Sequence, residues 1–220
     1  MATWAVIFRL EIRKYRSNIS ILILNKILGT NHQFNFPFMP ITSVAVFCGS
    51  QNGKNPLYAQ HTAQLGKLLA LAGLKIIYGG GNAGLMGIIA NSALAEGGEV
   101  IGVIPERLKE WERHHGGLTE LVVVPDMHTR KKMMYQGCDA AIILPGGFGT
   151  LDELFEMLTW NQLKIHDKKI FMLNTAGFYD PLRLHLQHLD QEGFLYDSLE
   201  ERIGFCPTPS HILESLNGAN

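Results

Sequence analysis

The stretch from residue 145 to residue 153 holds the residue types best suited to bind an anion and act on it. It reads Pro-Gly-Gly-Phe-Gly-Thr-Leu-Asp-Glu and directly follows the apolar run 142–144. Its closely spaced glycines allow a sharp turn and a close approach to a ligand, because no Cβ stands in the way. A helix that begins at such a turn points unpaired N–H groups and its positive dipole end at the ligand. The stretch therefore predicts a seat for a phosphate group.

Two residues of this stretch have the spacing of a helix start. Thr150 is the expected N-cap, and Glu153, three residues later, has capping-box spacing. The helix is expected to continue through Leu158. An alternative interpretation is a turn whose glycines serve only tight packing and whose Glu153 serves only as a cap. The spacing alone does not separate the two.

A basic cluster, Met-His-Thr-Arg-Lys-Lys at residues 127–132, opens the helix expected before the apolar run. Three successive cations at a helix start oppose the helix dipole, a modest cost that a bound anion or a carboxylate can offset. For Lys132 we expect a solvated position on a basic helix face. Arg130 is the functional candidate, because a guanidinium suits planar, bidentate recognition.

Residues 79–84 match the pattern GxGxxG between an expected strand and an expected helix, which is the setting of a dinucleotide-binding turn. The acid that would bind the ribose should close the next strand, about 20 residues on. Glu99 instead opens that strand. The pattern therefore predicts a close backbone approach to a mononucleotide or to a neighbouring loop, with NAD binding as a minor alternative.

The histidines and Cys48 lack the spacing of a metal site or a catalytic pair. His114, His115 and His128 are not placed four residues apart on one helix face, so we expect no metal and interpret them as surface or substrate-contacting residues. Cys48 has no evident histidine partner, which argues against a catalytic thiol. Glu112, an isolated loop acid, can reach a hydroxyl group or a base edge, although solvation is the default for such a residue.

From residue 43 onward, short apolar runs alternate with segments of helical periodicity. This alternation predicts an α/β fold with a Rossmann-like, doubly wound parallel sheet and helices on both faces. The expected strands are 44–48, 75–78, 99–104, 121–124, 140–144 and 169–173, and the expected helices are 58–72, 84–95, 127–136, one from Thr150, 180–191 and one from about Pro209. In such folds ligands bind at the carboxyl ends of the strands. The loops 49–53, 79–84, 105–117 and 145–150 should therefore share one edge of the sheet.

Composition places the chain among ordinary globular proteins. Its 220 residues are 46% hydrophobic with a net charge of −1, which gives no overall attraction to nucleic acid or membrane. Three dispersed cysteines without a CxxC pair favour a reducing, cytoplasmic setting. No apolar run approaches the ~20 residues that span a bilayer. We expect residues 39–220 to form one nucleotide-binding domain.

Residues 1–38 differ in charge from the rest of the chain. They carry a net +4, against −5 for the remainder. The segment can be a targeting sequence, an amphipathic extension, or a stretch upstream of a true start at Met39. We favour the last interpretation and expect the segment to be poorly ordered and outside the site.

Several motifs together resemble a known family. Residues 145–153 look like the PGGxGTxxE signature of the "lonely guy" proteins, the cytokinin riboside 5′-monophosphate phosphoribohydrolases, many of which carry a label of lysine decarboxylase. Residues 127–131 resemble the companion motif of that family. The segments 48–53, 79–87 and 159–160 also lie where the family places them. The resemblance covers about residues 43–215.

The resemblance implies a homodimeric enzyme that hydrolyses the N-glycosidic bond of adenosine 5′-monophosphate or of a cytokinin riboside 5′-monophosphate. Free base and ribose 5-phosphate would be the products, and no metal or cofactor is implied. By position, Arg130 and Glu153 would be the catalytic pair. The implied substrate-binding residues are Ser50, Gly53, Glu112, Lys131, Gly146, Gly147, Phe148, Gly149, Thr150 and Thr159.

Two other function classes are alternatives for this sequence. A nucleotide-binding module without catalysis is possible on the same sheet, although the presence of both Arg130 and Glu153 argues against it. A decarboxylase needs pyridoxal phosphate on a Schiff-base lysine. Lys131 and Lys132 are candidates for that lysine only by proximity, which makes this class the weaker one.

Overall fold

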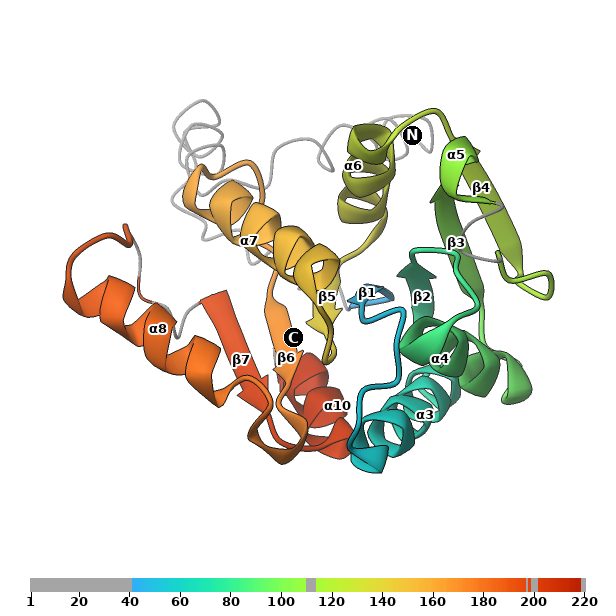
Figure 1. Ribbon diagram of the computed structural model, residues 1–220, viewed down its shortest axis with the longest axis horizontal. Helices are drawn as coiled ribbons and strands as arrows, with labels where there is room; N and C mark the ends of the chain where they lie inside the picture. Colours follow the sequence, from blue (N-terminus) through green and yellow to red (C-terminus); the bar gives the residue numbers. More distant parts are fainter. Residues whose placement is uncertain (1–40, 110–113, 197, 199–201, 219–220) are drawn as a thin grey trace, which may run out of the picture.

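Seven parallel strands form one sheet in the computed structural model, which describes residues 41–109, 114–196, 198 and 202–218. The strands are β1 (Ser43–Phe47), β2 (Lys75–Tyr78), β3 (Val100–Pro105), β4 (Glu120–Val124), β5 (Ala140–Ile143), β6 (Ile170–Leu173) and β7 (Ile203–Cys206). They lie in the order β4-β3-β2-β1-β5-β6-β7, with β1 at the centre (Figure 1). The predicted α/β class and Rossmann-like doubly wound sheet are confirmed.

The direction of chain progress reverses at β1. From this strand the chain builds outward through β2, β3 and β4, then returns to pair β5 with the other edge of β1. Val46 accordingly has Tyr78 of β2 on one side and Ile142 of β5 on the other. In open α/β sheets the crevice for a ligand lies at such a reversal, beyond the carboxyl ends of the strands. The loops after β1 and β5 are therefore the walls of the expected site.

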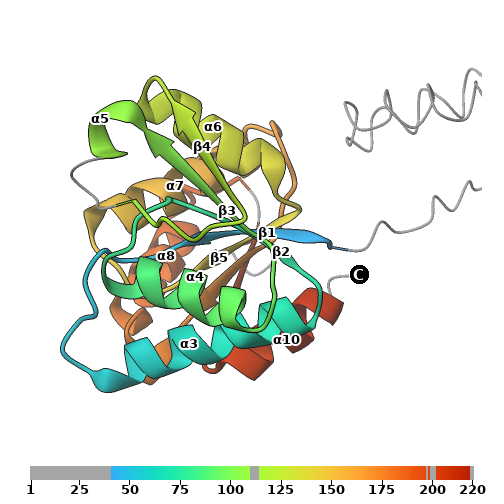
Figure 2. The same ribbon diagram turned by 90° about the vertical axis from the view of Figure 1, so that its right-hand side faces the viewer.

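Helices cover both faces of the sheet (Figure 2). One face is covered by α3 (Pro56–Leu71), α4 (Gly84–Ala95) and α10 (Pro209–Gly218), and the other by α6 (Met127–Gly137), α7 (Phe148–Gln162) and α8 (Asp180–Gln191). The short helix α5 (Glu106–Lys109) and the 3-10 turn η1 (Thr175–Gly177) complete the described elements.

The sequence of β1 shows why the strands read as unbroken apolar runs. Val44 and Val46 belong to the core under α3 and α4, whereas Ala45 and Phe47 belong to the core under α6 and α7. Neighbouring side chains of a strand point to opposite faces, so a sheet covered on both sides needs an apolar residue at every position. All five β1 residues are buried.

Three elements were not predicted, one of them the three-residue 3-10 turn η1. Strand β7, with the sequence IGFC, carries a glycine and is only four residues long, so it gave a weak strand signal. Helix α5 lies inside the segment expected to be a loop. The first 40 residues lie outside the described part of the chain, so the interpretation of residues 1–38 stays a prediction. No helix among the described residues is both long and apolar enough to cross a membrane.

Candidate active site

The glycine turn after β5 leads into α7 two residues earlier than predicted. The N-cap is Gly147, in extended conformation, and the first helical hydrogen bond runs from the Leu151 N–H to the Gly147 carbonyl oxygen at 3.1 Å. The prediction that Thr150 caps this helix and that Glu153 completes a capping box is therefore wrong. Thr150 is buried instead, and its hydroxyl oxygen lies where a Cβ on Gly146 would stand, 2.1 Å from that position. Packing over Gly146 thus replaces the capping role.

The first turn of α7 is open to an anion. Gly147, Phe148 and Gly149 are all exposed, and a glycine N-cap has no side chain to accept a hydrogen bond from this turn. The first N–H groups of a helix have no partner within the helix. Together with the dipole, these donors suit an anion, and the phosphate seat stays a prediction.

The loops that follow β1, β2 and β5 touch one another through backbone. The Gly49 N–H donates to the Pro145 carbonyl oxygen at 3.1 Å, and the Leu85 N–H donates to the Gly49 carbonyl oxygen at 3.1 Å. Gly84 has a φ of +58°, and a Cβ there would lie 2.3 Å from the Gln51 nitrogen. Of the two predicted reasons for the GxGxxG spacing, the structure thus shows the approach to a neighbouring loop.

Arg130 projects from α6 over the ends of β2 and β3 and is buried, with 6% of its surface exposed. Its Nε donates to the Val103 carbonyl oxygen at 3.1 Å, and its Nη2 donates to the Gly79 carbonyl oxygen at 3.3 Å. The cation-rich start of α6 is offset by a carboxylate, because Asp126 is the N-cap and accepts from the Thr129 N–H at 2.8 Å. Two backbone carbonyls therefore fix the guanidinium direction.

Glu153 reaches the same region from α7. Its side chain is buried, with the residue 8% exposed. Burial and the negative charge of Glu153 raise the pKa of the Cys48 thiol, whereas the positive charge of Arg130 lowers it. Both charges therefore act on Cys48, which directly follows β1 at the point where the strand order reverses. The raised pKa keeps the Cys48 thiol protonated.

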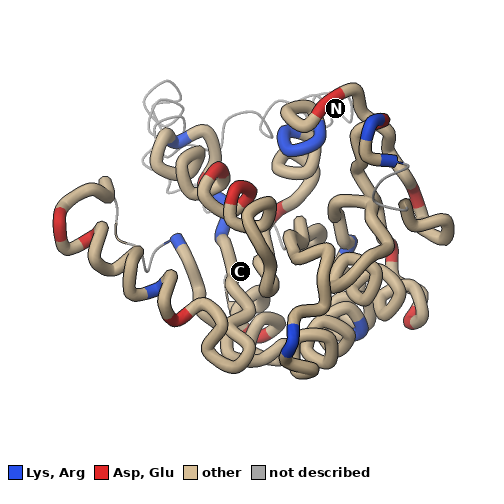
Figure 3. Tube along the Cα trace, in the orientation of Figure 1, with Lys and Arg blue, Asp and Glu red and all other residues tan. Residues whose placement is uncertain are grey.

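A network of charges joins α6 to α7 beside this pair; Figure 3 marks the basic turn of α6 and the acidic turns of α7. Lys131 Nζ lies 2.7 Å from Glu156 Oε2 and 3.1 Å from Asp152 Oδ2. The Tyr135 hydroxyl donates to Glu156 Oε2 at 3.0 Å. Asp152, Glu156 and Tyr135 were not predicted. The only signal was the four-residue spacing of the two acids, which places them on one helix face.

The other expected contact residues that the structure describes are exposed. Ser50 and Gly53 are exposed in the loop after β1, and Gly53, with φ +71°, closes against the Tyr58 ring. Thr159 is exposed on α7, and its hydroxyl donates to the Phe155 carbonyl oxygen at 2.7 Å. Lys132 is exposed, as expected. Glu112 lies outside the described residues.

His115 corrects the expectation of a surface or substrate-contacting histidine. It is buried, and its Nε2 lies 3.0 Å from Asn91 Oδ1. Its Nδ1 accepts from the Gly117 N–H at 3.1 Å, and its own N–H donates to the Gly80 carbonyl oxygen at 3.0 Å. Burial lowers the pKa of His115, which favours the neutral ring. The hydrogen bond from its backbone N–H to Gly80 holds the residue against the turn after β2. In the described part of the chain, no three His, Cys, Asp or Glu side chains are grouped to hold a metal.

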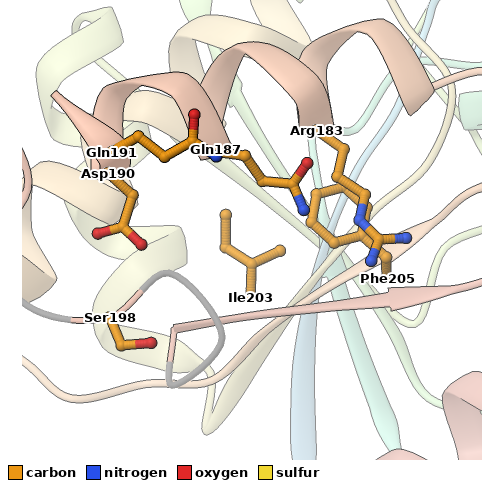
Figure 4. Close-up of a pocket in the computed structure, with 7 residues that line it drawn as sticks. All are labelled: Arg183, Gln187, Asp190, Gln191, Ser198, Ile203 and Phe205. Atoms are coloured by element: carbon orange, nitrogen blue, oxygen red, sulfur yellow. The ribbon is translucent and has the colours of Figure 1, made fainter.

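A cavity of about 580 Å³ lies away from these residues, between α8 and β7 at the sheet edge (Figure 4). It is lined by Arg183, Gln187, Asp190, Gln191, Ser198, Ile203 and Phe205. None of these belongs to the predicted site. On the sheet, β6 lies between β7 and β5, and both β6 and β5 lie between β7 and β1. The volume of a cavity therefore does not identify the reactive region here.

Comparison with known proteins agrees with the geometry. The family model described as "Possible lysine decarboxylase" matches residues 86–216. The chain is 46% identical over 165 residues to a cytokinin riboside 5′-monophosphate phosphoribohydrolase of Rhodococcoides fascians, covering 74% of this chain and 83% of that protein. It is 43% identical over 173 residues to a probable cytokinin riboside 5′-monophosphate phosphoribohydrolase of Oryza sativa subsp. japonica, covering 79% and 71%.

Solved structures show the same fold. The molybdenum cofactor binding protein of Rippkaea orientalis matches with a TM-score of 0.62 at 22% identity, covering 84% of this chain and 99% of that one. The molybdenum cofactor carrier protein of Chlamydomonas reinhardtii matches with a TM-score of 0.61 at 16% identity, covering 82% and 98%. At these identities the likeness concerns the fold alone. The sequence relatives decide the matter: the chain belongs to the family of the cytokinin riboside 5′-monophosphate phosphoribohydrolases.

Proposed function

We propose that this protein hydrolyses the N-glycosidic bond of adenosine 5′-monophosphate-type nucleotides, either the plain nucleotide or a cytokinin riboside 5′-monophosphate, to free base and ribose 5-phosphate. The observation that carries the proposal is that Arg130 and Glu153 are both buried and that the charge of each acts on the Cys48 thiol at the end of the central strand. The names of the relatives at 46% and 43% identity support the same reaction.

Glu153 is the proposed catalytic carboxylate. Departure of the base builds positive charge on the ribose ring, and a buried carboxylate beside the ring stabilises that charge or orients the attacking water. The water oxygen bonds to the anomeric carbon as the bond from that carbon to the base nitrogen breaks. One water proton passes through the carboxylate, and the departing base gains a proton, so no further reactant is needed.

Arg130 is the proposed partner on the side of the departing base. A guanidinium has five N–H donors, and backbone carbonyls hold its Nε and Nη2. The remaining donors can stabilise negative charge on the base or orient Glu153. Because the two carbonyl contacts fix the guanidinium before substrate arrives, little reorganisation is needed during the reaction.

The phosphate group is assigned to the turn formed by Gly146, Gly147, Phe148, Gly149 and Thr150. Binding there supplies energy that holds the anomeric carbon against the reacting groups. Lys131 adds a cation at the adjacent helix. Ser50, Gly53 and Glu112 are assigned to the nucleotide pocket, by position in the family pattern.

A second copy of the chain is proposed to pack along α7. Phe148, Phe155, Thr159 and Leu163 follow one another at helical spacing and are all exposed, Phe148 to 93%. Apolar side chains in such a stripe are typical of an interface. Thr159 lies six residues beyond Glu153, so we assign it to the nucleotide held by the second copy. Light scattering on a sizing column tests the dimer, and Phe155→Arg should yield monomers.

The deciding experiment is an assay of released base with a panel of nucleoside 5′-monophosphates. We expect adenine or its isoprenoid-substituted form to be released, with ribose 5-phosphate in equal amount. Binding of a nucleotide without release of base from any member of the panel would overturn the proposal. The compartment proposed is the cytosol, since Cys48, Cys138 and Cys206 are free thiols.

A further inference from the structure

Tyr135 is a buried residue of α6 whose hydroxyl points toward the part of α7 that carries Glu153. It is 1% exposed on α6, and its ring meets Phe47 and Trp160 edge to face, with centroids 5.8 and 5.1 Å away. Burial and the charge of Glu156 raise the pKa of Tyr135, so the hydroxyl remains a donor throughout any practical assay range. A ring held on two sides cannot swing its hydroxyl away from α7.

That hydroxyl faces two oxygens of α7. Glu156 Oε2 lies 3.0 Å away and the Glu153 backbone carbonyl oxygen 3.4 Å away. A hydroxyl has one proton, which goes mainly to the nearer, charged oxygen. The contact of the Tyr135 hydroxyl with the Glu153 carbonyl oxygen is the weaker of the two. It nevertheless involves the residue that carries the proposed catalytic carboxylate.

Glu156 connects the Tyr135 hydroxyl to the Lys131 ammonium. Its Oε2 accepts from Tyr135 and also lies 2.7 Å from Lys131 Nζ. The side chains of Lys131 and Glu156 are 12% and 24% exposed, whereas that of Asp152 is 60% exposed. An exposed ion pair contributes little because water screens it, so Glu156 rather than Asp152 fixes the lysine.

We propose that Tyr135 and Glu156 are positioning residues of the reaction: together they hold the Lys131 ammonium and the α7 turn of Glu153 in the arrangement that cleavage requires. The inference rests on the proposed function, because it assigns Lys131 and Glu153 to the nucleotide. It concerns two residues that do not themselves touch the substrate. Tyr135 acts through Glu156, and Glu156 acts through Lys131.

The alternative is that Tyr135 and Glu156 act only as a structural staple, meaning that their contacts stabilise the packing of α6 on α7 and nothing else. A staple lowers the unfolding temperature when removed but leaves the rate of the folded enzyme unchanged. A positioning pair lowers kcat in enzyme that is still folded. For Glu156 the two roles differ further, because loss of its charge leaves the positive charge of Lys131 less neutralised and should not weaken binding of a phosphate.

The test uses the full chain with adenosine 5′-monophosphate or the best substrate of the panel. Tyr135→Phe keeps the ring contacts and removes only the hydroxyl, and Glu156→Gln keeps an acceptor oxygen and removes the charge. We expect kcat to fall about tenfold in each, the effect of one hydrogen bond to a charged group, while KM does not rise. Glu96→Gln, which breaks the Lys67–Glu96 pair of 2.8 Å between α3 and α4, is the matched control and should keep native kcat.

The double variant Tyr135→Phe/Glu156→Gln should lose little more than the worse single variant, since both changes open the same network. A native kcat in Tyr135→Phe, with only a lower unfolding temperature, would overturn the inference, as would fully additive losses. Should Tyr135→Phe fail to fold, Glu156→Gln carries the same test, because its site is partly exposed. A native enzyme that releases no base from any nucleotide defeats the proposed function itself, a result distinct from these.

Discussion

The guanidinium of Arg130 lies directly against the backbone of Gly79. Nη2 donates to the Gly79 carbonyl oxygen at 3.3 Å, and a Cβ on residue 79 would stand 2.1 Å from that nitrogen. The absence of a side chain at residue 79 is thus a condition for the position of Arg130, which comes from a helix 51 residues later in the chain.

Gly79→Ala is therefore expected to displace the guanidinium without unfolding the protein, because the obstructed atom is the end of a flexible side chain. We expect kcat to fall by roughly 10- to 100-fold, which corresponds to part of a lost electrostatic contact. Circular dichroism should show a native fold. Gly218→Ala, where a Cβ would meet nothing within 4 Å, is the control. Native kcat in Gly79→Ala would show that Arg130 need not lie where the carbonyl holds it.

Glu153→Gln should abolish most turnover while preserving the shape of the site. Removing one preorganised electrostatic contact costs ~2.7–4 kcal/mol, or ~10²–10³ in rate. Base release measured under single-turnover conditions separates this loss from weaker binding. Near-native turnover would remove Glu153 from the catalytic role.

Arg130→Lys keeps the positive charge but loses the planar fork. We expect a loss of about 10²-fold or more in kcat, since an ammonium cannot hold the Val103 and Gly79 carbonyls and face the substrate at once. The measurement is kcat with the preferred nucleotide at saturation. A lysine variant as fast as the native enzyme would mean that charge alone suffices.

The open start of α7 predicts that the substrate must carry a phosphate. We expect kcat/KM for adenosine 5′-monophosphate to exceed that for adenosine by ~10²-fold or more, because remote binding energy positions the sugar. A direct comparison of the two substrates measures this ratio. Equal rates would mean that the glycine turn does not bind the phosphate during catalysis.

His166 predicts a pH dependence of stability. Burial, and then the positive charge of Lys168, lower the pKa of His166 from 6.5 to about 4. The unfolded chain therefore takes up a proton near pH 6.5 while the folded protein does not. Stability from this group is complete above pH 6.5 and is lost as the pH falls toward 4.

The His166 side chain is only partly buried and is therefore partly screened by solvent, so we expect a loss of about 1 kcal/mol between pH 7 and pH 4.5, less than full linkage would give. Urea unfolding of the native protein and of His166→Asn at the two pH values measures it. The asparagine variant should lose about 1 kcal/mol less than the native protein over this range. Equal losses would assign the pH dependence to other groups.

Six of the seven strands and most helix limits could be predicted because burial on both faces imposes apolar residues throughout each strand. Residues 75–78, 84–95 and 180–191 match the observed elements in full. The glycine turn after β5 was also predictable, since its glycines are a local requirement. That the loops following the strands lie at one edge of the sheet follows from the parallel topology alone.

The start of α7 could not be predicted because local preference does not choose between the candidate caps. Threonine and glycine are about equally favoured as N-caps, and packing decides, since the Thr150 side chain fills the space above Gly146. The pairing of Lys131 with Glu156 was equally hidden. It joins two helices whose separation depends on the whole sheet, and no spacing within either helix determines it.

The central place of β1 also bears on how the chain is made. Its edge toward β5 carries unpaired backbone groups and apolar side chains until residues 140–143 have left the ribosome. During that interval the nascent chain has β2 to shield one side of its innermost strand and nothing to shield the other. This edge is therefore open to aggregation from the synthesis of residue 47 until β5 docks, and chaperone demand should drop at that point.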